Sequence, residues 1–320
     1  MKVIAQAPTR ISLFGGGTDL PVFSDKYGGM VISMAINLRQ HIILDDENLE
    51  WTIPFGAKKD FYMPFLEKYD IDPDKIGITS KFDSVIESGL GSSASAAVAL
   101  LAAIKNYKGQ TLIHSNELVE EAWDIEVNKL GLYGGKQDQC AAVYGGMNMF
   151  WFRPKLSIWP ELISYIKYDS FDTFGIYGHT LLFYVGENRK NPKIQYELKS
   201  LNSKKIFALK KIKKLALEAS SHIRMGDRDT IGELLNETWE FKKKSNSKVS
   251  TRKIDLIYDT AIKSGAWGGK LCGSGGGGHM VFMASSKDHE KIIENLEKIE
   301  GVKNIDYSID WNGVETRVIK

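Results

Sequence analysis

Cysteine is scarce in this chain, with only Cys140 and Cys272 among 320 residues. Two cysteines are too few for a disulfide framework, and no spacing typical of a cysteine-bound metal is present. A large excess of one charge is lacking too, because the formal net charge is only +2. That balance gives no reason to expect a nucleic acid or another polyanion as partner. We therefore expect a protein of a reducing compartment, the cytoplasm.

Long apolar runs are also absent. The longest, residues 94–104, is interrupted by Ser95 and is too short to cross a bilayer. The N-terminal MKVIAQAPTR lacks the apolar core of a signal peptide. A predicted helix at 204–225 contains six lysines, but they lie off its apolar stripe, which favours a solvated face over nucleic-acid binding. No membrane partner is expected.

The remaining composition is that of a folded protein, with 43% hydrophobic and 26% charged residues. The length suits one large or two medium domains. Predicted strands and helices are mixed rather than strictly alternating, which favours an α+β fold over a doubly wound sheet. The second half reads strand, helices, strand, helix, strand, an order typical of a split βαβ sheet. We place the domain boundary between residues 1–175 and 176–320.

Hydrophobic periodicity and breaker residues give the expected elements. Strands are expected in the first 17 residues, broken at Pro8 and Gly15, and as a strand, turn and strand over residues 30–46. Further strands are expected at 179–187 and 314–319. The expected helices are 94–106, 116–130, 204–225, 230–244, 254–265 and 288–299.

The stretch GLGSSA, residues 89–94, is the most unusual local pattern. It matches the glycine spacing of a dinucleotide fingerprint, but the polar KFDSVIES before it is no buried strand, and residues 109–115 supply no ribose-binding acid. It is not a Walker A sequence either. A helix cap needs only one serine. The surplus of serines and glycines leaves a phosphate cradle at a helix start as the functional alternative to a cap.

Three other stretches carry chemically useful residues. PTRISLFGGGTDLP places Arg10 and Asp19 around three glycines, as either a structural turn or a site for a polyhydroxylated ligand. GGKQDQCAA contains Asp138, which is either a helix cap or a catalytic base. The helix before it contains Glu126, which is either a solvated side chain or a magnesium ligand. The run Gly275–Gly278 lies between strand-like segments, where glycines allow a close approach of two backbones or of a ligand.

Taken together, these stretches resemble the three motifs of the GHMP kinases. APTRISLFGGGTD is similar to the first motif, ESGLGSSASAAVA to the second and GGKLCGSGGGGHMVF to the third, in order and across most of the chain. The resemblance implies an N-terminal ribosomal-S5-like α/β domain, a C-terminal ferredoxin-like domain and an active site between them. It also implies ATP and Mg²⁺ as cofactors and a small-molecule acceptor.

The resemblance assigns roles by position. The ATP phosphates would be wrapped by Gly89, Leu90, Gly91, Ser92, Ser93, Ala94 and Ser95, while Ser93 and Glu126 would hold Mg²⁺. Asp138 would take the proton from the attacking hydroxyl, and the charge of Arg10 would keep it ionised and stabilise the transferred phosphoryl group. The substrate would contact Gly16, Gly17, Thr18, Asp19, Lys136, Gln137, Gly275 and Gly276.

The substrate is expected to be a sugar. Galactokinases have a Glu-His pair where this chain has Gly16 and Gly17, which opens room for a larger or phosphorylated sugar. FGGGTD, GGKQDQ and WEFKKKSN most resemble the branch that phosphorylates a heptose 7-phosphate at its anomeric hydroxyl. Kinases of fucose, galactose or amino sugars, and a non-catalytic sensor, remain alternatives. Basic candidates for the sugar phosphate are Lys136, Arg189, Lys190 and Lys193.

Overall fold

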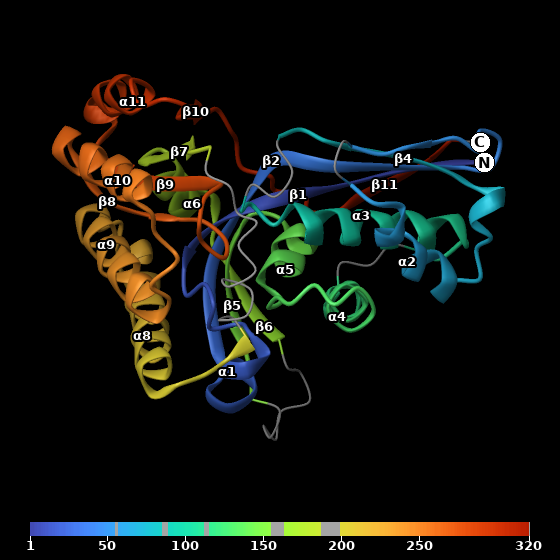
Figure 1. Cartoon of the computed structure of the whole chain (residues 1–320), viewed down its shortest axis with the longest axis horizontal. Helices are drawn as coiled ribbons and strands as arrows, with labels where there is room; N and C mark the ends of the chain where they lie inside the picture. The colour runs from blue at the N-terminus through green and yellow to red at the C-terminus, as the bar shows by residue number, and fades with distance from the viewer. Residues whose placement is uncertain (55–56, 85–88, 112–114, 155–162, 187–198, 320) are drawn as a thin grey trace.

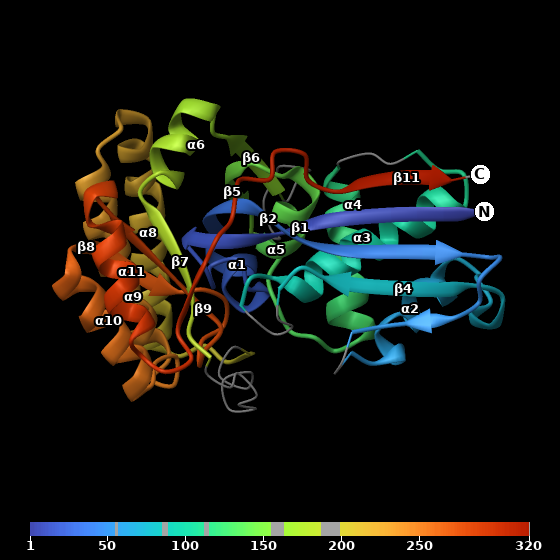
Figure 2. The same cartoon turned by 90° about the horizontal axis from the view of Figure 1, so that it is seen from above.

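The computed structural model describes residues 1–54, 57–84, 89–111, 115–154, 163–186 and 199–319. Two β-sheets lie side by side, each with helices packed on it (Figures 1 and 2). The larger sheet is built mainly from the first half of the chain and the smaller one from the second half. The α+β prediction is confirmed by this arrangement.

The larger sheet has seven strands in the order β11-β1-β2-β4-β3, with β5 paired to β2 and β6 to β5. The helix α3 packs against β1 and β2, and its buried alanines and leucines join the core of this half. The bounds in this half are β1 Lys2–Phe14, α1 Pro21–Tyr27, β2 Gly29–Asp45, β3 Trp51–Thr52, α2 Met63–Lys68, β4 Gly77–Phe82, α3 Ser92–Tyr107, α4 Asn116–Asp124, α5 Gln137–Tyr144, β5 Met147–Phe152, β6 Ile163–Lys167 and α6 Ser170–Tyr177.

The smaller sheet has the order β10-β7-β9-β8, with every neighbouring pair antiparallel. Its chain order is strand, helices, strand, strand, helix and strand, which has one strand more than the predicted order and is typical of a split βαβ sheet. The bounds are β7 Thr180–Tyr184, α8 Ser203–Met225, α9 Arg228–Ser245, α10 Arg252–Ser264, β8 Ala266–Leu271, β9 His279–Ala284, α11 His289–Glu297 and β10 Lys303–Ile305. The last strand of the chain, β11 Glu315–Ile319, belongs to the larger sheet.

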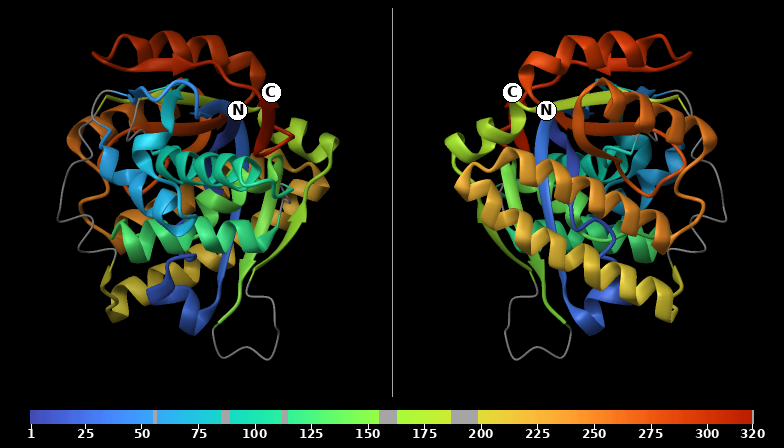
Figure 3. Two further views of the ribbon diagram at one scale, coloured as in Figure 1. Left: turned by 90° about the vertical axis from the view of Figure 1, so that its right-hand side faces the viewer. Right: turned by 90° about the vertical axis from the view of Figure 1, so that its left-hand side faces the viewer.

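Helices α8 and α9 form an antiparallel hairpin that runs past the larger sheet (Figure 3). The Asn202 side chain caps the start of α8 by accepting from the Lys205 amide, and Gly226 ends it in a left-handed conformation. One expectation about α8 is wrong, because Lys205 is only 7% exposed rather than solvated. Lys205 lies on the buried face of α8, beside the apolar stripe.

The final strand is another correction. Residues 314–319 were expected to complete the second sheet, but β11 pairs antiparallel with β1 at the edge of the first sheet. The second sheet is completed instead by β10, which has only three residues and therefore leaves almost no periodic signal in the sequence. The division into 1–175 and 176–320 stays a prediction, with the chain end returning to the first sheet.

The breaks predicted at Pro8 and within residues 30–46 are also wrong. The strand β1 continues through Pro8, and the register with β2 shifts between Pro8 and Thr9. Such an irregularity accommodates a proline that has no N–H for the ladder. The carbonyl of Pro8 instead accepts a hydrogen bond of 2.5 Å from the Ser95 hydroxyl. This hydrogen bond connects β1 to α3 next to the register shift.

Candidate active site

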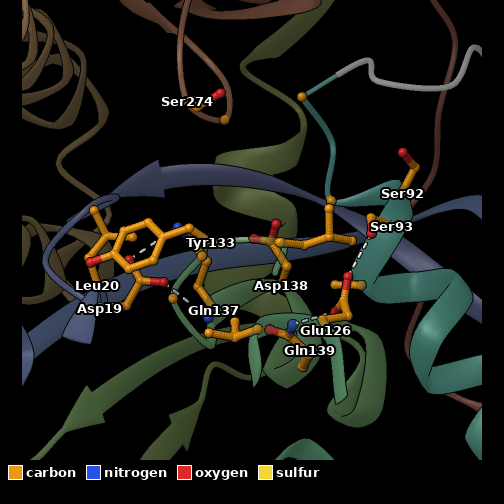
Figure 4. A pocket seen from close by; sticks show the side chains of 18 of the residues that line it. Asp19, Leu20, Ser92, Ser93, Glu126, Tyr133, Gln137, Asp138, Gln139 and Ser274 are labelled. Atoms are coloured by element: carbon orange, nitrogen blue, oxygen red, sulfur yellow. Dashed lines mark hydrogen bonds between the residues drawn. The ribbon is translucent and has the colours of Figure 1, made fainter. Parts of the chain in front are cut away.

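A cleft of about 1080 Å³ is lined by residues from both halves of the chain. The N-terminal half contributes the start of α3, the glycine turn after β1 and the segment leading into α5. The C-terminal half contributes the open end of the α8–α9 hairpin and the turn after β8. The predicted base Asp138 lies near the middle of the close-up in Figure 4, between Ser93 and Asp19.

Arg10 and Asp138 form a partly buried ion pair at the centre of this cleft. The guanidinium is 3% exposed and contacts Oδ1 of Asp138 through Nε at 2.8 Å and Nη2 at 2.6 Å. It also donates to the carbonyl of Gly89 at 2.6 Å. Strand β1 and helix α5 hold the two partners. Because Arg10 occupies Oδ1, it fixes the carboxylate orientation and ties it to the glycine-serine loop.

The glycine-serine loop begins α3 at Gly91, whose φ of 80° is left-handed. A side chain at this position would also meet the Asp138 carboxyl carbon at 3.0 Å. Glycine is therefore required both by the backbone and by the close approach of the base. Gly89, Ser92, Ser93 and Ala94 line the cleft beside it. The free amides of the first helical turn give this wall the character of an anion site.

Glu126 lies opposite this helix start. Its Oε1 accepts from the Ser93 hydroxyl at 2.6 Å and its Oε2 from Gln139 Nε2 at 2.7 Å. Burial raises the pKa of Glu126 to about 7. The predicted helix 116–130 changes at Ile125 into a π-helix over Ile125–Lys129. That wider turn carries Glu126, as is frequent for π-helical turns at functional sites.

The pair Ser93 and Glu126 offers two hard oxygen donors at one point of the cleft, the type of donor that Mg²⁺ prefers. The described parts of the chain contain no cluster of three His, Cys, Asp or Glu side chains placed to hold a metal. Gln139 Oε1 is buried without a hydrogen-bond partner among these residues. The donor set thus fits Mg²⁺ in the form that keeps water and substrate phosphate in its remaining positions.

Asp19 forms the other side of the cleft. Its carboxylate accepts from the amides of Gly17 at 3.1 Å and Gln137 at 3.2 Å. The Gln137 side chain donates to it at 3.3 Å and accepts from the Ser12 hydroxyl at 2.9 Å. Burial, followed by the nearby charge of Asp138, raises the pKa of Asp19 to about 6. This polar group, together with Gly16, suits sugar hydroxyls.

A buried lysine lies behind this group. Lys270 on β8 is 1% exposed, and its ammonium donates to the carbonyl of Ser12. Burial lowers the pKa of Lys270 to about 8, and the charge of Arg10 adds to the effect. Sequence reasoning placed Lys270 only within the third motif. The contact shows that this motif braces β1, directly behind the predicted sugar pocket.

Several predicted site residues have structural partners instead. The Thr18 hydroxyl donates to the carbonyls of Gly15 and Met30 within the turn. Lys136 pairs with Glu120 at 2.5 Å. Leu90 is fully buried, and its carbonyl accepts from the Arg10 amide. The remaining members are Ser95, bonded to Pro8; Gly275, packed against Val249; and Gly276, whose amide bonds the Val249 carbonyl.

None of these six residues lines the cleft. Spacing along the chain identified their motifs correctly, but it did not tell which side chains point inward. Arg189, Lys190 and Lys193 lie outside the described residues. The cleft wall also includes residues to which the sequence analysis gave no site role: Ser12, Phe61, Tyr62, Tyr133, Lys199, Lys205, Leu209, Lys242 and Asn246. Ser12 lies within the first motif, and Lys242 and Asn246 lie within WEFKKKSN. Most of them come from segments without glycine or serine runs, where no local signal marks a site.

Comparison with known proteins identifies this architecture. The model of the GHMP kinases N terminal domain matches residues 59–146, and that of the GHMP kinases C terminal matches residues 208–302. A D-glycero-alpha-D-manno-heptose 7-phosphate kinase of Campylobacter jejuni is 27% identical, over 99% of both chains. A galactokinase of Thermotoga maritima is 26% identical, over 97% of this chain and 98% of that protein.

Solved structures agree on the fold. A D-glycero-D-manno-heptose 1-phosphate kinase from Bacteroides thetaiotaomicron superposes with a TM-score of 0.78, covers 99% of both chains and is 24% identical. The predicted two-domain fold is thereby confirmed. Within the described ranges, no helix combines the length and the apolar character needed to cross a membrane. The chain belongs to the GHMP kinase family, as a sugar kinase that transfers a phosphoryl group to an alcohol acceptor.

Proposed function

We propose that this protein is an ATP- and Mg²⁺-dependent sugar 1-kinase acting on D-glycero-D-manno-heptose 7-phosphate. The product would be the 1,7-bisphosphate, on a route to activated heptose for surface polysaccharide. One observation carries the proposal: the Arg10–Asp138 pair lies in the cleft between the start of α3 and the polar group around Asp19. An acceptor hydroxyl beside Asp138 would therefore face a phosphate held at the start of α3.

The nucleotide would bind at the α3 side of the cleft. The amides at the start of α3 and the hydroxyls of Ser92 and Ser93 would contact the phosphates. Beyond them the cleft is lined by Phe61 and Tyr62, whose rings meet edge to face at a centroid distance of 5.3 Å. An apolar wall next to a phosphate site suits the adenine base. This position extends the motif-based assignment, which reached only the phosphates.

Ser93 and Glu126 would hold Mg²⁺, which would neutralise phosphate charge during transfer. The ion requires Glu126 in its ionised form. Burial disfavours that form, as the raised pKa of Glu126 indicates. Binding of Mg²⁺ would therefore release the proton of Glu126. The Gln139 amide, which donates to Oε2, would orient the carboxylate, and Oε1 would be the oxygen available to the metal.

Asp138 would accept the proton of the anomeric hydroxyl as that oxygen attacks phosphorus. Arg10 holds Oδ1, which leaves Oδ2 on the Gly91 side of the carboxyl group, where it lies 3.1 Å from the position of a Cβ at Gly91. The buried guanidinium also stabilises negative charge that develops near the loop. The chemistry needs little beyond this, since phosphoryl transfer depends mostly on positioning and electrostatics.

The choice of sugar rests on two observations. Gly16 and Gly17 line the cleft without side chains, leaving room where galactokinases have larger residues. The Campylobacter relative, a heptose 7-phosphate kinase, matches this chain from end to end. The alternative is another sugar 1-kinase of the family, acting on galactose, fucose or an amino sugar, and the Thermotoga galactokinase supports keeping it.

A sugar panel tests the proposal. ADP release is measured with D-glycero-D-manno-heptose 7-phosphate, the unphosphorylated heptose, galactose, fucose and an amino sugar. We expect kcat/KM for the heptose phosphate to exceed the others by about 10²-fold or more, the usual discrimination when a charged partner is missing. Equal or better turnover of an unphosphorylated sugar contradicts the heptose-phosphate proposal and leaves a kinase of that sugar.

A further inference from the structure

Lys270 is a buried ionisable residue that the reaction described above does not use. It lies on β8 at 1% exposure, where the smaller sheet meets β1. Burial has the largest effect on its pKa and lowers it, while smaller effects come from Cys272 and Arg10, neither of which is a carboxylate. A buried ammonium group without a carboxylate beside it is unfavourable. Its place in the fold therefore calls for an explanation, and its hydrogen bond to the Ser12 carbonyl supplies one.

The Ser12 carbonyl lies on the outer edge of β1, beyond the reach of the neighbouring strand. The strand β11 pairs with this edge only over Lys2–Gln6. Further along, the Arg10 amide donates to the carbonyl of Leu90 at 2.9 Å. Residues two apart in a strand direct their backbone groups to the same edge, so the Ser12 carbonyl points the same way as the Arg10 amide. The ammonium of Lys270 thus takes the place of a strand partner.

The side chain of Ser12 continues the connection into the cleft. Its hydroxyl donates to Oε1 of Gln137 at 2.9 Å. The backbone and side-chain amides of Gln137 donate to Asp19 at 3.2 Å and 3.3 Å, and Figure 4 shows Gln137 between Asp19 and Asp138. Consecutive hydrogen bonds therefore lead from Lys270 through β1 and the start of α5 to the carboxylate that we assign to the sugar hydroxyls.

Close packing surrounds these bonds. A Cβ at Gly16 would lie 3.0 Å from the Ser12 hydroxyl oxygen, so the glycine turn touches this serine. On the side of the smaller sheet, Ile11 of β1 belongs to the same buried cluster as Cys272 of the third motif. Because protein interiors are close-packed and transmit small shifts, a change in the position of Ser12 would displace Gln137 or the glycine turn.

We propose that Lys270 is a positioning residue for the acceptor sugar. Its ammonium group fixes Ser12 on β1, and Ser12 in turn holds Gln137, which orients the Asp19 carboxylate for the sugar hydroxyls. The proposal rests on the proposed function, because it uses Asp19 as the sugar-binding carboxylate. It gives the third motif a part in sugar binding in addition to its part in the fold.

The test compares Lys270→Met and Lys270→Gln with Lys263→Met, which changes an exposed lysine of α10 that does not line the cleft. Methionine keeps the length of the side chain without its charge. Glutamine keeps a polar end and remains informative if Lys270→Met folds poorly. The KM values for sugar and for ATP are measured separately, with the sugar of the panel that the wild type turns over best. Urea unfolding is measured for every variant.

We expect both Lys270 variants to raise KM for the sugar about tenfold, within the usual range of such indirect effects, while KM for ATP changes less than about twofold. Adding Lys270→Met to Asp19→Asn should raise KM for the sugar by less than about twofold, because residues of one network are not additive. Lys263→Met should match the wild type. An unchanged KM for the sugar, equal increases for sugar and ATP, or full additivity with Asp19→Asn would overturn the proposal.

Hydrogen exchange of the backbone amides gives a readout that needs no substrate. The Gly17 and Gln137 amides donate to Asp19, and we expect both to exchange faster in Lys270→Met without a matching change in β9. Acceleration throughout the chain, or none at these two amides, overturns the positioning role. The proposed function is decided separately: if the wild type prefers an unphosphorylated sugar, the heptose-phosphate proposal fails and the Lys270 comparison is made with that sugar. If it turns over no sugar of the panel, hydrogen exchange alone decides.

Discussion

At the scale of single residues, the cleft is organised by buried charges with few partners. Arg10 donates to Asp138 and to the Gly89 carbonyl, and these bonds connect the base, the loop and β1. Removing Arg10 would leave the partly buried Asp138 carboxylate without its counter-charge, which destabilises proteins more than loss of an exposed pair. The more informative change is therefore at Asp138, which is 27% exposed.

Asp138→Asn should keep the fold and the nucleotide site but lose phosphoryl transfer. The amide oxygen can still accept from Arg10, whereas the amide cannot take a proton from the sugar. We expect kcat to fall about 10²–10⁴-fold, the usual contribution of a general base, with ATP affinity within about threefold by calorimetry. Near-normal turnover would remove Asp138 from the role of base.

Asp19 gives a pH dependence. Its pKa is raised to about 6, so the carboxylate is protonated as pH falls through 6 and then accepts fewer hydrogen bonds from sugar hydroxyls. We expect KM for the sugar to rise below pH 6, by about tenfold per pH unit at most. Asp19→Asn should have a high KM that is flat between pH 5 and 8. A wild-type KM that does not change over this range contradicts the assignment.

The proximity of site residues was predicted well where a motif fixes both the residue and its partner, while the roles of these residues stay predictions. Arg10, Ser93, Glu126 and Asp138 were assigned from the sequence, and the structure brings these four together. Ser95 shows the limit, since it belongs to the same serine run but donates to the Pro8 carbonyl of β1. No spacing within the loop could reveal that partner, because Pro8 lies 87 residues away.

At the scale of elements, the first turn of α3 has two faces, of which one lines the cleft and the other packs on β1. Ser93 faces the cleft and Glu126, while Ser95 faces β1 and Pro8. The two serines are therefore a matched pair for one substitution. The change to π-helix at Ile125 has a similar role, because it sets the direction of Glu126. Hydrophobic periodicity predicted a helix there, but it could not distinguish a π-helical last turn from an α-helical one.

Ser93→Ala and Ser95→Ala should separate function from stability. Ser93→Ala removes a proposed Mg²⁺ ligand, and we expect the Mg²⁺ concentration for half-maximal activity to rise about tenfold. Ser95→Ala leaves the Pro8 carbonyl without its buried donor, and we expect a loss of about 1–3 kcal/mol in the free energy of unfolding. Urea unfolding and Mg²⁺ titration check the pair. The assignments would be contradicted if Ser95→Ala changed the Mg²⁺ concentration for half-maximal activity, or if Ser93→Ala left it unchanged.

At the scale of the whole molecule, the chain ends where it began. The strand β11 covers the outer edge of β1, so both termini lie at the same end of the larger sheet (Figure 1). The order of elements along the chain predicted an α+β fold, and the split βαβ order predicted the second sheet. The return of residues 315–319 was not predicted, because local patterns do not say which distant strand is the partner.

A truncation after residue 314 tests the importance of this return. It would expose the edge of β1 and remove Val318, which packs against the core of the larger sheet. We expect a lower Tm and self-association through the open edge, measured by calorimetry and size-exclusion chromatography. Lys320 removal alone is the control. An unchanged Tm would mean that β11 contributes little to the stability of the first sheet.

The central claim is that the cleft transfers the γ-phosphoryl group of ATP to the anomeric hydroxyl of a heptose 7-phosphate. The most direct measurement is ³¹P NMR of the reaction of the purified enzyme with Mg·ATP and D-glycero-D-manno-heptose 7-phosphate. We predict ADP together with a new phosphate resonance coupled to the anomeric proton, while the resonance of the 7-phosphate persists. A product phosphorylated at another carbon, or turnover only of sugars without a phosphate, would contradict the account.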